Sequence, residues 1–111
     1  MKELTALMFT PEGKRKIRLR IIGRIIFLHK RINDTTQLTM IEQFREKGAK
    51  IDEADNWIRI DMFAGNNLVK LGDMEFDVDT KSETEMENIL VNFFKLKYKQ
   101  AHFKVKVKEI E

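Results

Sequence analysis

The stretch KIRLRIIGRIIFL, residues 16–28, decides the fold of this chain. Through residues 16–21, lysine and arginine alternate with isoleucine and leucine, the period of a strand with one polar and one apolar face. Gly23 and Arg24 then separate two runs rich in β-branched residues, as a two-residue hairpin loop does. The pattern therefore predicts a β-hairpin with strands over 15–22 and 25–31.

A single long helix is the alternative for this region, with Thr10 as its N-cap and Pro11 as its first residue. On a helical wheel, however, Leu19 and Phe27 fall outside the apolar stripe. Six isoleucines between residues 17 and 32 also prefer strands, because they are β-branched. The sequence therefore favours two strands over the helix.

Two amphipathic helices are predicted further along the chain. Asp34 is a suitable N-cap for a helix over 35–47, and Gly48 is suitable for its end. Ser82 and Glu85 match a capping box that opens a second helix over 83–98. The expected apolar positions are Leu38, Met40, Ile41 and Phe44 in the first helix, and Met86, Ile89, Leu90, Phe93 and Leu96 in the second.

Alternating apolar and polar residues predict the remaining strands, at 3–9, 58–62, 68–71, 74–79 and 103–110. The order is then βββ-α-βββ-α-β, an α+β fold of antiparallel meanders packed on two amphipathic helices. With 111 residues, we expect one domain over 1–111. A shift of 49 residues places Gly23 on Gly72 and Phe27 on Phe76, which raises a duplicated βββα unit as a hypothesis.

The composition excludes several classes of function. The chain has no Cys, which excludes disulfides, a thiol nucleophile and cysteine-ligated zinc, and which fits a reducing cytoplasm. Its longest apolar cluster, residues 21–28, is far shorter than the ~20 residues of a membrane span. The first apolar run is too short for a signal peptide. We therefore expect a cytoplasmic protein with no membrane partner.

Candidates for catalysis are few. His29 and His102 form no ligand-spaced pair, and no glycine-rich phosphate loop precedes a helix. Glu75, Asp77 and Asp79 alternate as on the solvated face of a strand, without the spacing of a calcium loop. We expect no enzymatic activity, no metal and no cofactor.

Charge is polarised along the chain. Residues 1–48 carry 11 Lys and Arg against 5 Asp and Glu, residues 49–88 carry 4 against 11, and residues 89–111 carry 6 against 2. Dense cations attract phosphates and release counterions, and arginine suits bidentate phosphate contact. We therefore expect the basic N-terminal hairpin to bind RNA or DNA, mainly through phosphate. The expected binding residues are Lys14, Arg15, Lys16, Arg18, Arg20, Arg24, Lys104, Lys106 and Lys108.

Two aromatic residues are candidates for stacking on bases beside these cations: Trp57, predicted on the face opposite Ile58, and Tyr98 near the basic end of the second helix. The lysine ladder at 104–108 is equally typical of an edge strand protected against pairing with another chain. The alternative function is an accessory or inhibitory factor of phage or mobile-element type. Such a factor would bind a protein partner through the acidic segment 73–87, or form a homo-oligomer.

Overall fold

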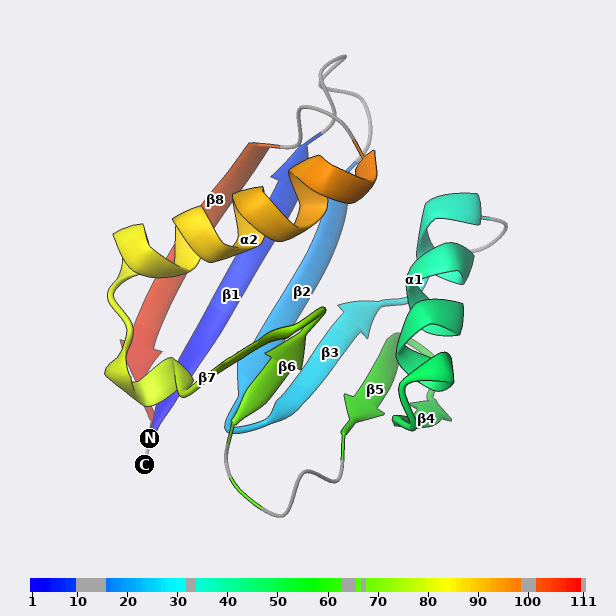
Figure 1. The fold of residues 1–111 in the computed structure, drawn as a ribbon, viewed down its shortest axis with the longest axis horizontal. Coiled ribbons are helices and arrows are strands. Elements are labelled where there is room, and N and C mark those ends of the chain that lie inside the picture. Colours follow the sequence, from blue (N-terminus) through cyan, green and yellow to red (C-terminus); the bar gives the residue numbers. More distant parts are fainter. Residues whose placement is uncertain (10–15, 32–33, 63–65, 67, 99–101, 111) are drawn as a thin grey trace.

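The described residues form a six-stranded antiparallel sheet with two helices and a small hairpin on one of its faces (Figure 1). The structure is a computed structural model that describes residues 1–9, 16–31, 34–62, 66, 68–98 and 102–110, without the side chains of Lys16, Thr36 and residues 95–98. The large sheet contains β1 (Lys2–Phe9), β2 (Lys16–Ile22), β3 (Ile25–His29), β4 (Lys50–Glu53), β5 (Trp57–Asp61) and β8 (His102–Glu109). Its covering layer contains α1 (Thr35–Glu46), β6 (Val69–Leu71), β7 (Met74–Phe76) and α2 (Glu83–Tyr98).

The α+β class is confirmed, and the elements follow the predicted order with one further strand, β4, after α1. The order across the sheet is β4-β5-β3-β2-β1-β8. The first and last strands of the chain therefore pair, with Lys2 opposite Glu109 and Phe9 opposite His102. This pairing places the two basic segments of the sequence on either side of β1, in β2 and β8.

The hairpin predicted from residues 16–28 is present as β2 and β3. Gly23 has a φ of 58°, which its tight two-residue loop requires and which glycine adopts without strain. Leu19 and Ile26 point into the core on opposite strands of the hairpin. The long helix is thereby excluded over 16–31, whereas Thr10 and Pro11 lie outside the described residues.

The first helix begins as predicted, because the Asp34 carboxylate accepts a 3.1 Å hydrogen bond from the backbone N–H of Gln37. Leu38, however, does not belong to the buried stripe, since 59% of its surface is exposed. Gln37 points inward instead: its amide donates to the His29 carbonyl at 2.8 Å and accepts from the Arg31 N–H at 3.0 Å. These two hydrogen bonds tie α1 to the end of β3.

The strands predicted in the second half are present but do not form one meander. Ile58 and Ile60 of β5 lie opposite Leu28 and Ile26 of β3, so β5 extends the apolar face of the large sheet. Among the described strands, β6 and β7 pair with each other alone, and they lie across the covered face between the two helices (Figure 1). The predicted β7 strand ends early, at Phe76, because the Asp77 side chain caps a 3₁₀ turn over Val78–Thr80.

This placement bears on the hypothesis of a duplicated unit. Gly23 and Gly72 both turn a two-stranded hairpin, with φ values of 58° and 62°. The first hairpin belongs to the large sheet, whereas the second lies on top of it. The two segments of the chain therefore take different places in the fold.

The second helix opens with the predicted capping box. The backbone N–H of Glu85 donates to the Ser82 hydroxyl at 3.1 Å, and the Ser82 N–H donates to the Glu85 carboxylate at 3.2 Å. Phe94 rather than Phe93 lies at the centre of the buried stripe, with its ring centroid 5.1 Å from that of Phe103 on β8. Phe93 is half-buried beside the β6–β7 turn, 3.6 Å from where a Cβ on Gly72 would lie.

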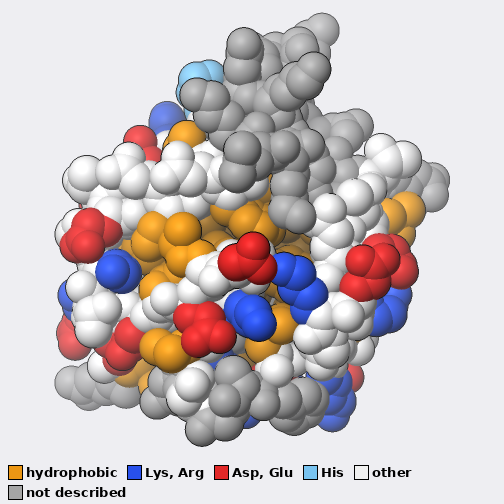
Figure 2. All heavy atoms as spheres, viewed as in Figure 1, with side chains coloured by type: hydrophobic (Ala, Val, Ile, Leu, Met, Phe, Trp, Pro, Cys, Tyr) orange, Lys and Arg blue, Asp and Glu red, His pale blue; other side chains and the backbone are white. Residues whose placement is uncertain are grey.

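The hydrophobic core lies between the sheet and its covering layer. Figure 2 shows the covered side from outside, where apolar side chains remain visible between the charged residues. A hollow of about 480 Å³ opens there between α2 and the β6–β7 turn, with Met74 and Phe93 among its lining residues. Among the described residues, no helix has the length and apolar character needed to cross a membrane.

Candidate functional site

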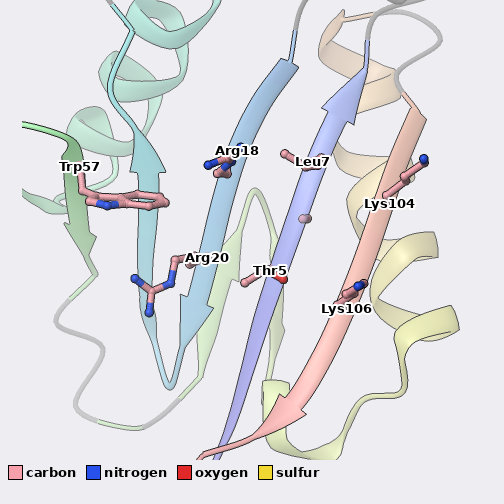
Figure 3. A pocket seen from close by; sticks show the side chains of 8 residues that line it. Thr5, Leu7, Arg18, Arg20, Trp57, Lys104 and Lys106 are labelled. Carbon is pink, nitrogen blue, oxygen red and sulfur yellow. The ribbon is translucent and has the colours of Figure 1, made fainter.

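The second face of the sheet has no helix or strand over it in the part of the chain that the structure describes (Figures 1 and 3). Side chains alternate along each strand, so the residues between the buried ones point to this side. We call this surface the open face. Its residues include Thr5, Leu7, Phe9, Arg18, Arg20, Phe27, His29, Trp57, Arg59, Lys104, Lys106 and Lys108.

Cations of β2 and β8 flank the central strand on the open face. Leu7 of β1 lies opposite Arg18 on one side and Lys104 on the other. Thr5, two residues earlier, lies opposite Arg20 and Lys106 in the same way. Two rows therefore run across the sheet, each with a cation, a small or apolar residue and a second cation.

A hollow of about 540 Å³ lies over these rows (Figure 3). Its lining is mostly apolar, with the charged groups contributed by β2 and β8. The lining residues are Thr5, Ala6, Leu7, Arg18, Arg20, Trp57, Lys104 and Lys106. Four of the predicted basic residues, Arg18, Arg20, Lys104 and Lys106, thus line one hollow together with the predicted stacking residue Trp57.

Trp57 is half-buried, and its indole extends from β5 across β3 towards β2 (Figure 3). The His29 ring lies perpendicular to it in a T-shaped contact, with centroids 5.3 Å apart and planes at 89°. The Arg20 guanidinium carbon lies 5.6 Å from the indole centroid and 5.7 Å from that of Phe27, which is a cation–π geometry. These neighbours hold the indole in a defined position at the border of the hollow.

Carboxylates on the open face are paired with arginines. Glu3, which is largely buried, accepts a 2.7 Å hydrogen bond from Arg20. Asp61 lies 3.1 Å from Arg24 and 3.7 Å from Arg59. Arg20 and Arg24 were both expected to bind phosphate, but the structure holds each of them against the protein's own carboxylates.

The remaining described cations of the expected set are exposed. Arg18, Lys106 and Lys108 make no ion pair with any residue that the structure describes. The Lys104 ammonium lies 5.7 Å from the centroid of the Phe9 ring. These four side chains give the β8–β1–β2 part of the open face a positive charge that Glu3, with Arg20 beside it, does not offset.

The other expected site residues are only partly described. Lys14 and Arg15 lie outside the described residues, and Lys16 is described as a backbone position of β2, opposite Phe9. Tyr98 ends α2, without a description of its side chain. Strand β8 is also an edge strand, as the alternative interpretation of the lysine ladder requires.

Several open-face residues were not predicted as site residues. Phe9, Phe27, His29 and Arg59 surround the hollow or its aromatic border. The signal was present in the sequence: Phe27 and His29 alternate with buried Ile26 and Leu28 within one predicted strand. What the sequence lacked was the order of strands, which decides whose side chains are neighbours.

The acidic segment and the histidines form no metal site among the described residues, because no group of three or more His, Asp or Glu side chains lies together there. Asp77 caps the turn at Val78–Thr80, and the Asp79 carboxylate accepts a 2.6 Å hydrogen bond from the Lys2 backbone N–H. The expected alternation of Glu75, Asp77 and Asp79 along one strand is therefore wrong beyond Phe76.

The chain matches no known protein-family model, no curated protein and no solved structure.

Proposed function

We propose that the protein binds nucleic acid, without catalysis, through phosphate contacts on the open face of its sheet. The observation that carries this proposal is the convergence of Arg18 from β2 with Lys104 and Lys106 from β8 on one hollow. Cations placed in this way attract a polyanion and release its condensed counterions. Contacts of this kind position a ligand but read little sequence.

Protection of a sheet edge accounts for only part of this surface. Lysines on β8 serve that role well, because β8 lies at an edge. Arg18, in contrast, lies on β2, an interior strand, where no edge needs protection. A polyanion ligand accounts for the cations of both strands at once.

The proposed surface differs from the hairpin expected from sequence. Arg20 and Arg24 are engaged with Glu3 and Asp61, so the phosphate contacts fall to Arg18 and to the lysines of β8. The proposal includes a cytoplasmic location, where RNA and DNA are accessible and where a chain without Cys needs no disulfides.

A charge-reversal experiment tests the proposal. Arg18→Glu combined with Lys106→Glu should weaken binding of a fluorescent oligonucleotide in anisotropy titrations at several salt concentrations. The slope of log affinity against log salt should fall in magnitude by about 1.5, since each lost phosphate contact removes about 0.7–0.9. The matched control, Lys47→Glu with Lys70→Glu, makes the same charge change outside the open face. Unchanged affinity of the Arg18/Lys106 variant for both single- and double-stranded ligands would eliminate the proposal.

Self-association is the second candidate, favoured by the opposite charges that one chain presents. The open face is basic, whereas Asp73 and Glu75 are exposed beside the β6–β7 turn. Head-to-tail contact between two copies would then weaken with salt. Light scattering during gel filtration, at low and high ionic strength, measures this directly. A monomer mass independent of salt and concentration would exclude it.

A further inference from the structure

The floor of the open-face hollow differs from its borders. Leu7 and Thr5 form the floor, and the cations of β2 and β8 stand on either side of it. Phosphate groups can pair with the cations but cannot cover the apolar surface between them. That surface contributes to binding only when an apolar group of the ligand buries it. The best ligand therefore brings a flat, apolar group together with its phosphates.

Nucleic acid bases are such groups, but only when their faces are accessible. In a duplex, each base is stacked between its neighbours, and exposing it requires unpairing and unstacking. In a single strand the base faces are available for aromatic platforms next to cations. From the floor and Trp57 together, we infer that the ligand is single-stranded nucleic acid, with a base stacked at Trp57. This inference rests on the proposed function.

Trp57 is suited to this role because it is already held in place. Its T-shaped contact with His29 and its contact with the Arg20 guanidinium fix the indole. Arg20 is itself fixed by its 2.7 Å hydrogen bond to Glu3. A ligand that stacks here orders few additional side chains, which lowers the entropy cost of binding. The pairing of Arg20 with Glu3 thus positions the aromatic residue instead of binding phosphate.

The row from Trp57 to Lys104 also gives the ligand a path. It crosses β5, β3, β2, β1 and β8, which at about 4.8 Å per strand is a span of about 19 Å. Aromatic surface lies at Trp57 on β5 and again beside the row at Phe9, two residues after Leu7 on β1, where the Lys104 ammonium is 5.7 Å from the ring centroid. A single strand lying across the sheet can therefore meet aromatic and cationic groups along this row.

Trp57 is the only tryptophan of the chain, so its fluorescence reports directly on stacking. The wild-type protein is titrated with oligothymidine and oligouridine of about 10 nucleotides, within the site sizes of single-strand binding domains. A DNA duplex with an equal number of phosphates and inorganic polyphosphate are the comparison ligands. We expect both single strands to quench the fluorescence and to bind about tenfold more tightly than the duplex, and polyphosphate to bind without quenching.

Two variants separate stacking from charge. Trp57→Leu should lose about tenfold in affinity for oligothymidine, with an unchanged salt slope and unchanged binding of polyphosphate. Trp57→Phe keeps an aromatic ring and should lose much less. Thermal unfolding of both variants checks that the sheet is intact, and quenching of the wild-type protein tests the inference without any variant.

The outcomes distinguish the two proposals. Equal affinity for single strand and duplex, without quenching, overturns the single-strand inference but leaves phosphate binding in place. No binding of any of the four ligands overturns the proposed function, and this inference with it. Quenching by only one of the two single strands supports the inference and shows a preference for the sugar or for the thymine methyl group, the two features in which these ligands differ.

Discussion

The two faces of the large sheet are built from the same strands but have opposite compositions. On β1, Leu4, Ala6 and Met8 are buried under the covering layer, while Thr5, Leu7 and Phe9 alternate with them on the open face. On β2, buried isoleucine and leucine alternate with arginine in the same way. The covered face is fully accounted for by packing, because every large side chain there contributes to one core.

The open face is not accounted for in this way. Trp57 points away from the covered face and so does not pack in the core. The exposed cations on β2 and β8 repel one another across β1. Within the described residues, this face combines a large aromatic residue with cations that form no ion pair, which a binding surface explains and core packing does not. The difference between the faces thus separates the residues of the fold from the residues of the proposed function.

The largest expected effect is a loss of stability when the packing of the covered face is disrupted. Leu4→Ala removes a side chain with 0% exposure and should lower the free energy of unfolding by about 2–5 kcal/mol. Leu7→Ala, three residues along the same strand but half-buried on the open face, should lower it by about 1 kcal/mol. Urea unfolding monitored by circular dichroism measures both.

For the affinity of ligand binding, the order of the two variants should be reversed. Leu7 lies on the floor of the hollow, so Leu7→Ala should weaken oligothymidine binding by the folded protein, whereas Leu4→Ala should not. Equal losses of stability for the two variants would contradict the assignment of the faces.

A smaller effect is expected at the buried carboxylate of the open face. Glu3→Gln replaces the charged partner of Arg20 and should cost about 1–2 kcal/mol of stability, since hydrogen bonds between charged groups exceed neutral ones. It should also raise affinity for oligonucleotides severalfold, because the Arg20 charge is no longer offset. Glu109→Gln, on an exposed side chain of the neighbouring strand, is the control and should leave stability nearly unchanged. An affinity decrease in Glu3→Gln would indicate that positioning of Trp57 by Arg20 outweighs charge.

Much of the fold could be predicted from local patterns. The β2–β3 hairpin, both helix starts and the capping box at Ser82 follow from residues close together in sequence. The position of the β6–β7 hairpin could not be predicted, since its alternation fits a large sheet as well as a separate one. Strand β4 was missed because it is short and its residues are mostly exposed at the sheet edge.

The site could be predicted only in part, because local patterns do not show which strands become neighbours. Period-two cations indicated which residues of β2 and β8 share a face, but not that β1 would lie between them. Ion pairing also depends on long-range neighbours: Glu3 is 17 residues from Arg20, and Asp61 is 37 residues from Arg24. Sequence alone therefore overestimated the cations available for phosphate.

Substitutions that remove one positive charge from either side of the sheet compare the two faces more finely. Lys106→Gln should lower the magnitude of the salt slope by about 0.7–0.9 and reduce affinity a few-fold, because it removes one phosphate contact. Lys70→Gln makes the same change on the β6–β7 hairpin, on the other side of the sheet, and should leave the slope unchanged. Anisotropy titrations between low and physiological salt measure both. Equal slopes in the two variants would mean that net charge, and not the open face, governs binding.

The smallest expected effect concerns Glu85, in the capping box at the start of α2. The backbone N–H of Ser82, then its hydroxyl, and then Lys81 hold the pKa of Glu85 below its ordinary value of 4.5. A lowered folded-state pKa means that the unfolded chain takes up the proton first, so the stabilisation is complete above pH 4.5 and disappears as pH falls through the folded pKa.

The difference in Tm between the wild-type protein and Glu85→Gln should therefore shrink as the pH is lowered from about 6 to about 3, because the charge that distinguishes them is titrated. The pH-dependent part should be small, since Glu85 is exposed to solvent. A Tm difference independent of pH would show that the charge of Glu85 adds nothing to the cap. Because α2 packs on the covered face, oligothymidine affinity at neutral pH should be the same in both proteins, whereas a change in affinity would mean that the open face depends on the start of this helix.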